Sequence, residues 1–283
     1  MLVSKWDDYK IIKASDGQKL ESWKGIKLLR PDPIVIWNVG KISENECDAF
    51  YHRSSSGGGY WENINDIPSS WQISYKNLTF NIKQMGFKHT GLFPEQAVNW
   101  DRMIQKIKNS SKKSVKVLNL FAYTGGASIA CLSAGAIVTH VDSSKGMNDW
   151  AKENVKISNL DDKEIHFLVD DVKKFVQREI RRGNKYDAII MDPPSYGRGS
   201  NGEVWSIEKD LNDLLFDIRK LLTDDFLFVC VNTYTANLSL LTLECLLKVV
   251  FKNNKISVDE IALPIKENNL FLPCGITGWI ENE

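Results

Sequence analysis

Residues 117–126, VLNLFAYTGG, run from an apolar stretch into a glycine turn, and Asp142 closes the next apolar stretch of the chain. The pattern predicts a strand, a tight turn, a helix and a second strand that ends in a carboxylate. Glycine lets a ligand approach the backbone, and the start of the helix offers free N–H groups. The single Gly125–Gly126 pair differs from the GxGxxG of dinucleotide enzymes. We therefore predict a nucleotide-type cofactor site at the carboxyl edge of a parallel sheet.

The bulk composition limits the class of protein. Of the 283 residues, 43% are hydrophobic and 25% are charged, as in an ordinary globular protein. Lys plus Arg equals Asp plus Glu, at 36 each, so only local basic patches could contact a nucleic acid. The five cysteines include no CxxC pair, which argues against a zinc cluster and a disulfide framework, and we expect no metal. Without a signal core or a membrane-length apolar run, we expect a soluble cytoplasmic protein with no membrane partner.

Residues 1–86 are the first expected domain, which is small and mostly β. Short β-like runs alternate there with turn signals such as Ser15-Asp16-Gly17. Five of the nine tryptophans also lie in this part. They either fill a small core or stack on nucleic-acid bases, and we favour the core. The expected strands are residues 10–14, 24–29, 34–37, 71–75 and 78–82.

Residues 87–283 are the second expected domain. Near-continuous apolar strands alternate with helices, which is typical of a parallel sheet covered on both faces. We expect an α/β fold, with a doubly wound, mostly parallel, seven-stranded sheet and an antiparallel C-terminal strand. The expected strands are residues 115–121, 137–141, 165–169, 186–191, 226–231, 255–263 and 275–281. The expected helices are residues 126–135, 145–158, 172–181, 206–222 and one that ends near residue 251.

Two acidic positions follow the second and third expected strands. Asp142 stands where a ribose diol would lie, although Asp142 or Ser143 would also suit the cap of the next helix. Asp171 would accept a hydrogen bond from the amine of an adenine, or it caps a helix, and its spacing fits both roles equally. We favour the ligand for Asp142 and leave both roles open for Asp171.

Residues 191–197, MDPPSYG, follow the fourth expected strand and carry the strongest single signal. Two prolines restrict φ and hold the turn rigid, so the Asp192 carboxylate and the following carbonyls become fixed acceptors. Such acceptors would hold an amino group or ring N–H of a planar substrate, and Tyr196 could stack on it. The alternative is a merely rigid turn. We expect the catalytic residues to be Asp192, Pro193, Pro194 and Tyr196.

In order and spacing, NLFAYTGG, VDSS, VDDV and DPPSYG resemble the motifs of class I S-adenosylmethionine-dependent methyltransferases. With HTGLFPEQ before them, the chain is similar to the bacterial 23S ribosomal RNA group that holds the cytosine-C5 and guanine-N7 enzymes. The likeness covers roughly residues 85–235, and the N-terminal part resembles relatives that lack a PUA domain. These motifs are specific for the fold and for S-adenosylmethionine, and much less so for the target.

The resemblance implies a role for each motif residue. The turn after the first strand would surround the methionine end, Asp142 would bind the ribose, and Asp171 with Val172 the adenine. Glu95 and Gln96 would lie over the cofactor, whereas Ala97 stands where relatives often carry Arg. The implied cofactor contacts are Gln96, Phe121, Tyr123, Gly125, Gly126, Asp142, Ser143, Asp171, Val172 and Asp192.

Whether the methyl group goes to a carbon or a nitrogen atom of a base depends on whether a cysteine is available as a nucleophile. Methylation of cytosine at C5 needs a thiolate that adds to the ring, and in relatives this cysteine lies just past the fifth strand. Thr233 or Tyr234 occupies that place here, and Cys230 falls earlier, inside an apolar strand, where we expect a buried structural thiol. A base nitrogen already carries a lone pair, so positioning can supply most of its rate. We therefore expect N-methylation, with Asp192 orienting the base.

RNA, and ribosomal RNA in particular, is the expected partner. Two basic runs either contact RNA or are solvated helix faces. Residues 198–201 are better placed for a phosphate, and Trp205 either packs or stacks. The alternatives are a protein or small-molecule methyltransferase and a non-catalytic RNA-binding relative. The two runs are Lys106, Lys108, Lys112, Lys113 and Lys116, and Lys173, Lys174, Arg178, Arg181, Arg182 and Lys185.

Overall fold

The computed structural model of the protein describes residues 1–3, 5–54, 58–199, 202–234 and 238–282. The chain forms two compact units. The larger contains residues 98–261 and 275–283, together with Met1. The smaller contains residues 2–97 and 262–274. No helix among the described residues is long and apolar enough to span a membrane.

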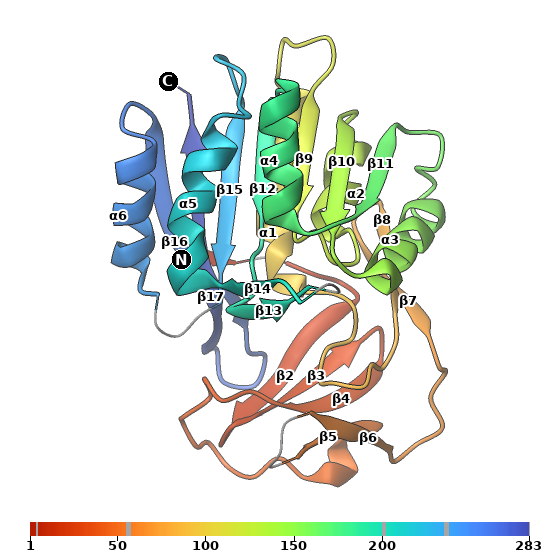
Figure 1. Cartoon of the computed structure of the whole chain (residues 1–283). Coiled ribbons are helices and arrows are strands. Elements are labelled where there is room, and N and C mark those ends of the chain that lie inside the picture. The colour runs from red at the N-terminus through yellow and green to blue at the C-terminus, as the bar shows by residue number, and fades with distance from the viewer. Residues whose placement is uncertain (4, 55–57, 200–201, 235–237, 283) are drawn as a thin grey trace. The chain divides into compact units, whose positions relative to one another are not determined.

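The larger unit is built on a mostly parallel sheet (Figure 1). Its strands belong to an eight-stranded sheet with the order β1-β16-β17-β15-β12-β9-β10-β11, in which β1 (Leu2–Val3) is one strand more than the seven predicted. The neighbours from β15 to β11 pair in parallel, and β17 pairs antiparallel with β15, which confirms the predicted sheet. The bounds are β9 (Lys116–Leu120), β10 (Ile137–Asp142), β11 (Ile165–Val169), β12 (Ala188–Met191), β15 (Phe228–Thr233), β16 (Lys255–Pro264) and β17 (Phe271–Glu281).

Three helices of this unit begin at a residue whose side chain caps the first turn. Ser144, Asp171 and Ser239 each accept a hydrogen bond from the first turn of the helix that follows. Every residue of β12 and β15 is buried, as expected of strands that are covered on both faces. Figure 1 shows α4, α5 and α6 along one face of the sheet. The bounds are α1 (Ala97–Lys108), α2 (Gly126–Ser133), α3 (Lys145–Ile157), α4 (Val172–Arg182), α5 (Ile207–Arg219) and α6 (Leu240–Val250).

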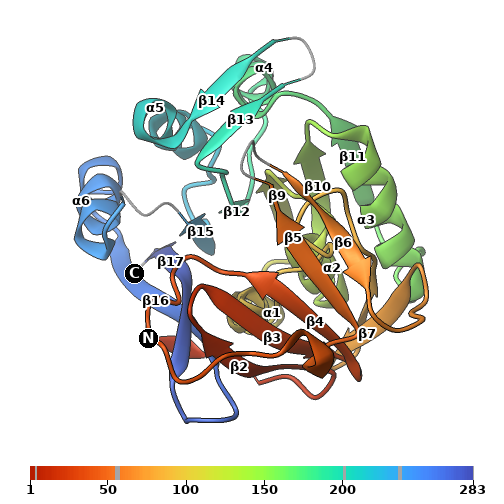
Figure 2. The same cartoon turned by 90° about the horizontal axis from the view of Figure 1, so that it is seen from below.

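The smaller unit is mostly β, as predicted (Figure 2). Its five-stranded sheet has the order β2-β3-β4-β5-β6, and β7 and β8 form a separate hairpin. All of these pairs are antiparallel except the parallel pair of β4 and β5. The bounds are β1 (Leu2–Val3), β2 (Tyr9–Ser15), β3 (Gln18–Trp23), β4 (Ile26–Pro31), β5 (Ala49–Arg53), β6 (Gly59–Asn63), β7 (Trp71–Tyr75) and β8 (Leu78–Ile82), with 3₁₀ turns η1 (Glu44–Glu46) and η2 (Pro94–Gln96).

The strand predicted over residues 34–37 is wrong. This segment is irregular, and its carbonyls accept hydrogen bonds from the turn at Asp16 and Gly17 and not from a neighbouring strand. Asp16 donates its backbone N–H to the Trp37 carbonyl at 2.8 Å, and Gly17 donates to the Val35 carbonyl at 2.7 Å. Pro33 lacks the N–H group that a strand entering here would need.

The core interpretation of the five tryptophans in residues 1–86 is confirmed for Trp23 alone. The Trp23 side chain is fully buried. The other four are partly buried, and each donates its indole N–H to a backbone carbonyl. The acceptors are the carbonyls of Pro94 for Trp6, Ala14 for Trp37, Met85 for Trp61 and Trp23 for Trp71.

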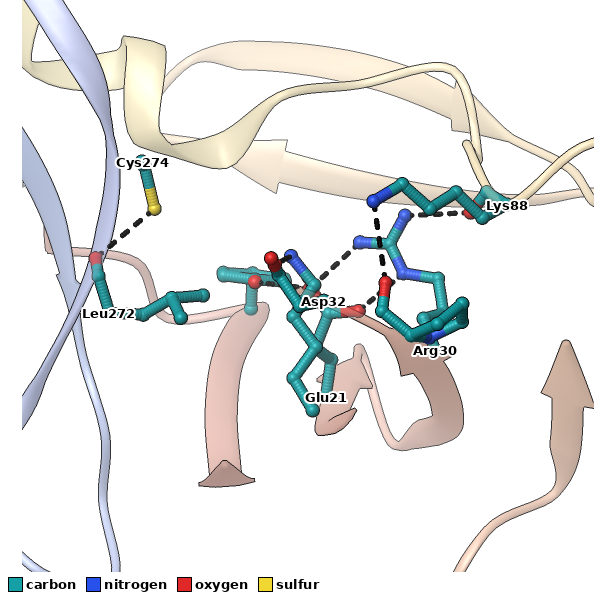
Figure 3. Close-up of polar contacts among 9 residues, drawn as sticks. Glu21, Arg30, Asp32, Lys88, Leu272 and Cys274 are labelled. Carbon is teal, nitrogen blue, oxygen red and sulfur yellow. Dashed lines mark hydrogen bonds and ion pairs between the residues drawn. The ribbon is translucent and has the colours of Figure 1, made fainter. Parts of the chain in front are cut away.

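A buried ion pair joins two strands of the smaller unit (Figure 3). Arg30 donates from Nε and Nη2 to the Glu21 carboxylate at 2.5 and 2.8 Å, and the Tyr9 hydroxyl adds a third donor at 2.6 Å. Burial opposes ionisation of Glu21, but the charge of Arg30 and these hydrogen bonds lower its pKa to about 2. Arg30 Nη1 also donates to the Lys88 carbonyl at 2.9 Å. The pair therefore ties the segment that begins KHTGLFPEQ to the sheet of this unit.

Candidate active site

The turn after β9 has an unusual backbone. Phe121, Tyr123 and Gly125 have φ values of +55°, +52° and +89°. For an L residue this region costs about 1–2 kcal/mol, and such strain is concentrated at functional sites. Gly125 avoids that cost and is the residue before α2. Asn154 holds the turn from α3 through a hydrogen bond of 2.9 Å to the Thr124 carbonyl.

Asp142 also holds this turn from the end of β10. One carboxylate oxygen accepts the backbone N–H of Tyr123 at 2.8 Å, and the other accepts that of Ser144 at 2.9 Å. The cap of α3 is Ser144, so the alternative in which Asp142 or Ser143 caps that helix is wrong. Burial raises the pKa of Asp142, while the two hydrogen bonds act in the opposite direction. Each oxygen keeps a lone pair that can accept a further hydrogen bond.

Close packing within the larger unit explains why position 126 is a glycine. A Cβ atom on Gly126 would lie 2.7 Å from Cζ2 of Trp100, which is closer than real Cβ contacts come. Glycine at this position therefore lets the ring of Trp100, on α1, approach the start of α2.

Ser143, another predicted cofactor contact, is exposed and lies between Asp142 and Ser144, the cap of α3.

A buried polar layer beneath the turn was missed by sequence reasoning. Asn119 of β9 donates to the Ser128 hydroxyl at 2.9 Å, and the same hydroxyl lies 2.9 Å from Nδ1 of His140 on β10. Burial lowers the pKa of His140 to about 3, so its ring is neutral at physiological pH. The available signal was a polar residue, Asn119 or His140, inside each of two mostly apolar strands.

Asp171 is the cap of α4, which confirms one of its two predicted roles. Its Oδ1 accepts the backbone N–H of Lys174 at 2.9 Å. Val172 begins the helix, and its side chain packs in the core of the larger unit with 4% exposure. The adenine contact of these two residues stays a prediction.

The DPPSYG segment starts beside the strained turn. Leu120 of β9 pairs with Met191 of β12, so Phe121 and Asp192 leave adjacent strands at the same edge of the sheet. A two-stranded hairpin follows, in which β13 (Tyr196–Arg198) pairs antiparallel with β14 (Val204–Ser206). Neither strand of this hairpin was predicted from the sequence.

Trp205 of β14 fixes the proline turn. Its indole N–H donates to the Pro194 carbonyl at 2.6 Å, so this carbonyl is already engaged within the protein. The Trp205 ring centroid lies 5.0 Å from that of Phe121, and the side chain is 7% exposed. The packing role predicted for Trp205 is therefore confirmed. In contrast, Tyr196 on the same hairpin is 56% exposed and available for stacking.

The end of β15 carries no accessible thiol. Cys230 is fully buried, burial raises its pKa to about 12, and its Sγ lies 3.6 Å from the Thr277 hydroxyl. The prediction of a structural thiol is confirmed. The Thr233 side chain is 1% exposed, and its hydroxyl has no hydrogen-bond partner within the described part of the chain.

Asn99 of α1 is another buried polar residue that the sequence did not indicate. It donates to Oδ1 of Asn232 at 3.0 Å and accepts the indole N–H of Trp279 at 3.0 Å. The Thr277 hydroxyl is a second donor to the Asn99 carbonyl oxygen, at 3.3 Å. This network joins α1, β15 and β17 behind the end of β15.

Most cations of the two predicted basic runs are engaged in ion pairs within the larger unit, which favours solvated helix faces. Ser200 and Asn201, at the end of the predicted phosphate contact, lie outside the described residues. The pairs are Lys106–Glu281, Lys112–Asp187, Lys173–Asp210, Lys174–Glu203, Arg178–Asp170 and Arg182–Glu179.

Two further predicted site residues belong to the smaller unit. Glu95 and Gln96 lie in η2, and both side chains are buried. Burial raises the pKa of Glu95 to about 7. Within the described ranges, no group of three acidic, histidine or cysteine side chains is placed to hold a metal ion.

Comparison with known proteins identifies the family to which the chain belongs. The family model described as S-adenosylmethionine-dependent methyltransferase matches residues 49–247. A crystal structure of the S-adenosylmethionine-dependent methyltransferase from Agrobacterium tumefaciens is 30% identical, with a TM-score of 0.93. That match covers 100% of this chain and 94% of the other.

Curated relatives share only part of their length with this chain. The ribosomal RNA large subunit methyltransferases K/L of Pseudoalteromonas atlantica and Colwellia psychrerythraea are 30% and 28% identical over 223 and 222 residues. These matches cover 78% and 77% of this chain but only 30% of each relative. The family model and the Agrobacterium structure both extend over most of the sequence, and the chain belongs to the S-adenosylmethionine-dependent methyltransferase family.

Proposed function

We propose that the protein transfers a methyl group from S-adenosylmethionine to a base of RNA, and that this RNA is ribosomal. The observation that carries the cofactor assignment is the Asp142 carboxylate, which holds the strained turn through Tyr123 and keeps acceptor capacity. The proposed RNA substrate is supported by the relatives named ribosomal RNA large subunit methyltransferase K/L.

The residues of the larger unit suit this cofactor. When bound, S-adenosylmethionine supplies an electrophilic methyl group on a sulfonium sulfur. Asp142 would accept from the ribose hydroxyls, and the second oxygen of Asp171 would accept from the adenine amine. The backbone around Phe121, Tyr123 and Gly125 would receive the methionine end, because a positive φ turns successive N–H groups towards one side.

The acceptor atom in this proposal is a nitrogen. A carbon acceptor on cytosine needs a thiolate that adds to the ring, and the burial of Cys230 argues against that role. A base nitrogen attacks through its own lone pair, so the protein needs to position it beside the methyl carbon. Asp192 would accept a hydrogen bond from the base and orient that nitrogen, and Tyr196 would stack on the ring.

The proposal is tested with RNA from a strain in which the gene for this protein is deleted, because that RNA lacks the methyl group. Ribosomal RNA of that strain, incubated with the protein and methyl-labelled S-adenosylmethionine, should gain label at one nucleotide. Mass mapping of wild-type and deletion RNA should find the same nucleotide, methylated on nitrogen. A ribosomal substrate would place the protein in the cytoplasm.

Other outcomes separate the rival functions. Label that enters protein or small molecules, with none in RNA, would mean a different substrate class. Calorimetric binding of S-adenosylhomocysteine without turnover on any RNA fraction would indicate a non-catalytic relative. A methyl group on C5 of cytosine would refute the nitrogen assignment and leave the RNA substrate intact.

A further inference from the structure

The smaller unit contains a cavity of about 460 Å³ at its edge strand β2. One wall consists of residues 5–7 and the start of β2, and the other is the tip of the β16–β17 hairpin. This tip lies beside β2 (Figure 2). Ile11 forms a parallel bridge with Ile265, and its carbonyl accepts the backbone N–H of Lys266 at 3.0 Å. These backbone contacts fix the width of the cavity. Its volume falls within the range of about 300–1,000 Å³ that is typical of small-ligand sites.

More basic than acidic side chains line the cavity, so its wall carries a net positive charge. Lys5, Lys10 and Lys266 contribute to its wall, and the only acidic lining residue is Asp7. Lys5, Lys10 and Lys266 are exposed, and none of their ammonium groups has an ion pair or hydrogen bond to the described residues. They differ in this respect from the basic runs of the larger unit, whose cations are mostly paired. Such unpaired lysines can neutralise phosphates.

Aromatic side chains complete the wall. Trp6 and Tyr9 both line the cavity. The Trp6 ring is held in place by its indole N–H, which donates to the Pro94 carbonyl at 2.9 Å, and by Tyr75, whose ring centroid is 4.7 Å away. A ring that is ordered in advance loses little conformational entropy when a base stacks on it. Cationic groups beside an aromatic platform are the usual means of holding single-stranded nucleic acid.

We propose that this cavity is an RNA-binding subsite that takes one nucleotide of a single-stranded segment. Its base stacks on Trp6, and the flanking phosphates are neutralised by Lys5, Lys10 and Lys266. The inference rests on the proposed RNA substrate and adds a contact outside the methyl-transfer site. The smaller unit thereby contributes to substrate binding.

The test measures RNA affinity as a function of salt. A fluorescein-labelled single-stranded RNA of mixed sequence is titrated with the full-length protein at several NaCl concentrations. In the triple variant Lys5→Ala/Lys10→Ala/Lys266→Ala, the slope of log affinity against log salt should fall by about 2, since each lost phosphate contact removes about 0.7. The control triple variant Lys41→Ala/Lys252→Ala/Lys255→Ala removes the same charge from other exposed positions and should retain the wild-type slope.

The stacking contact is tested by a matched pair at Trp6. Trp6→Leu and Trp6→Phe both lose the hydrogen bond to Pro94, but only Trp6→Phe keeps an aromatic face. Trp6→Leu should weaken RNA binding by about five- to a hundredfold with an unchanged salt slope, and Trp6→Phe should bind as the wild type does. Affinity for S-adenosylhomocysteine should be unchanged in every variant, which shows that the larger unit is intact.

Three results would overturn the assignment. If the wild-type protein binds no RNA at any salt concentration, both the proposed RNA substrate and this subsite are refuted. Salt-dependent wild-type binding that the lysine variant retains in full would refute the subsite alone. Equal competition by polyglutamate, or equal binding by Trp6→Leu and Trp6→Phe, would show a general anion site in place of a nucleotide site.

Discussion

Replacement of Asp142 by Asn tests the cofactor site most directly. The carboxylate accepts two backbone N–H groups, from Tyr123 at 2.8 Å and Ser144 at 2.9 Å. An asparagine keeps one acceptor oxygen and turns an NH₂ group towards the other donor, so one bond is lost and the other is no longer assisted by a charge. A hydrogen bond to a charged group contributes about 1.5–3 kcal/mol, and we expect a loss of this size in the free energy of unfolding.

The same substitution removes the proposed ribose acceptor. Loss of a second charge-assisted bond, again about 1.5–3 kcal/mol, should weaken S-adenosylhomocysteine binding by about ten- to a hundredfold. Isothermal titration calorimetry measures this dissociation constant, and urea denaturation of the free protein measures the stability change separately. Asp149→Asn is the matched control. It removes a carboxylate from the surface of α3, where Asp149 pairs with Lys152 at 2.9 Å.

The two measurements together decide the role of Asp142. The control should bind the ligand within about twofold of the wild type, because an exposed ion pair on the surface of a helix contributes little. If folded Asp142→Asn also binds within twofold of the wild type, Asp142 holds the turn and does not contact the cofactor. An equal loss in Asp149→Asn would show that the general charge of this region controls binding.

Three further predictions concern single side chains. Glu21→Gln leaves Arg30 buried without its charged partner and should lower the free energy of unfolding by about 3–5 kcal/mol in urea denaturation. Because the pKa of Glu21 is lowered from 4.5 to about 2, wild-type stability should fall as pH drops from 4.5 towards 2; the same fall in Glu21→Gln would contradict this. Asp171→Ala should lose about 1 kcal/mol by removing the cap bond to Lys174, and Asp171→Asn much less, because Asn caps equally well; equal thermal stability of both would count against the cap. Cys230→Ala should retain methyl transfer in the RNA assay, and complete inactivation with the fold intact would restore the cytosine-C5 mechanism.

The regular elements of the larger unit were largely predictable from local pattern. Its strands are short apolar runs, and glycine or a capping residue marks where the helices begin. The smaller unit was less predictable. The segment at residues 34–37 reads as a strand, yet its carbonyls bond to a turn elsewhere in the chain. Strands β3, β5 and β6 were missed, because polar residues interrupt their short apolar stretches and leave little apolar signal.

The family, the parallel sheet and the positions of the acidic site residues can be inferred without a structure. These follow from local order: apolar strands must be covered on both faces, and a glycine turn between a strand and a helix presents backbone N–H groups. Asp142 and Asp192 could therefore be placed at strand ends without coordinates.

The folded chain is needed to see which polar groups already have a partner within the protein. Asp171 caps its own helix, and Trp205 holds the Pro194 carbonyl. Lys112 pairs with Asp187, whereas Lys10 has no such partner among the described residues. Electrostatic and hydrogen-bonding partners are set by distances between residues far apart in the chain, and sequence spacing does not encode those distances.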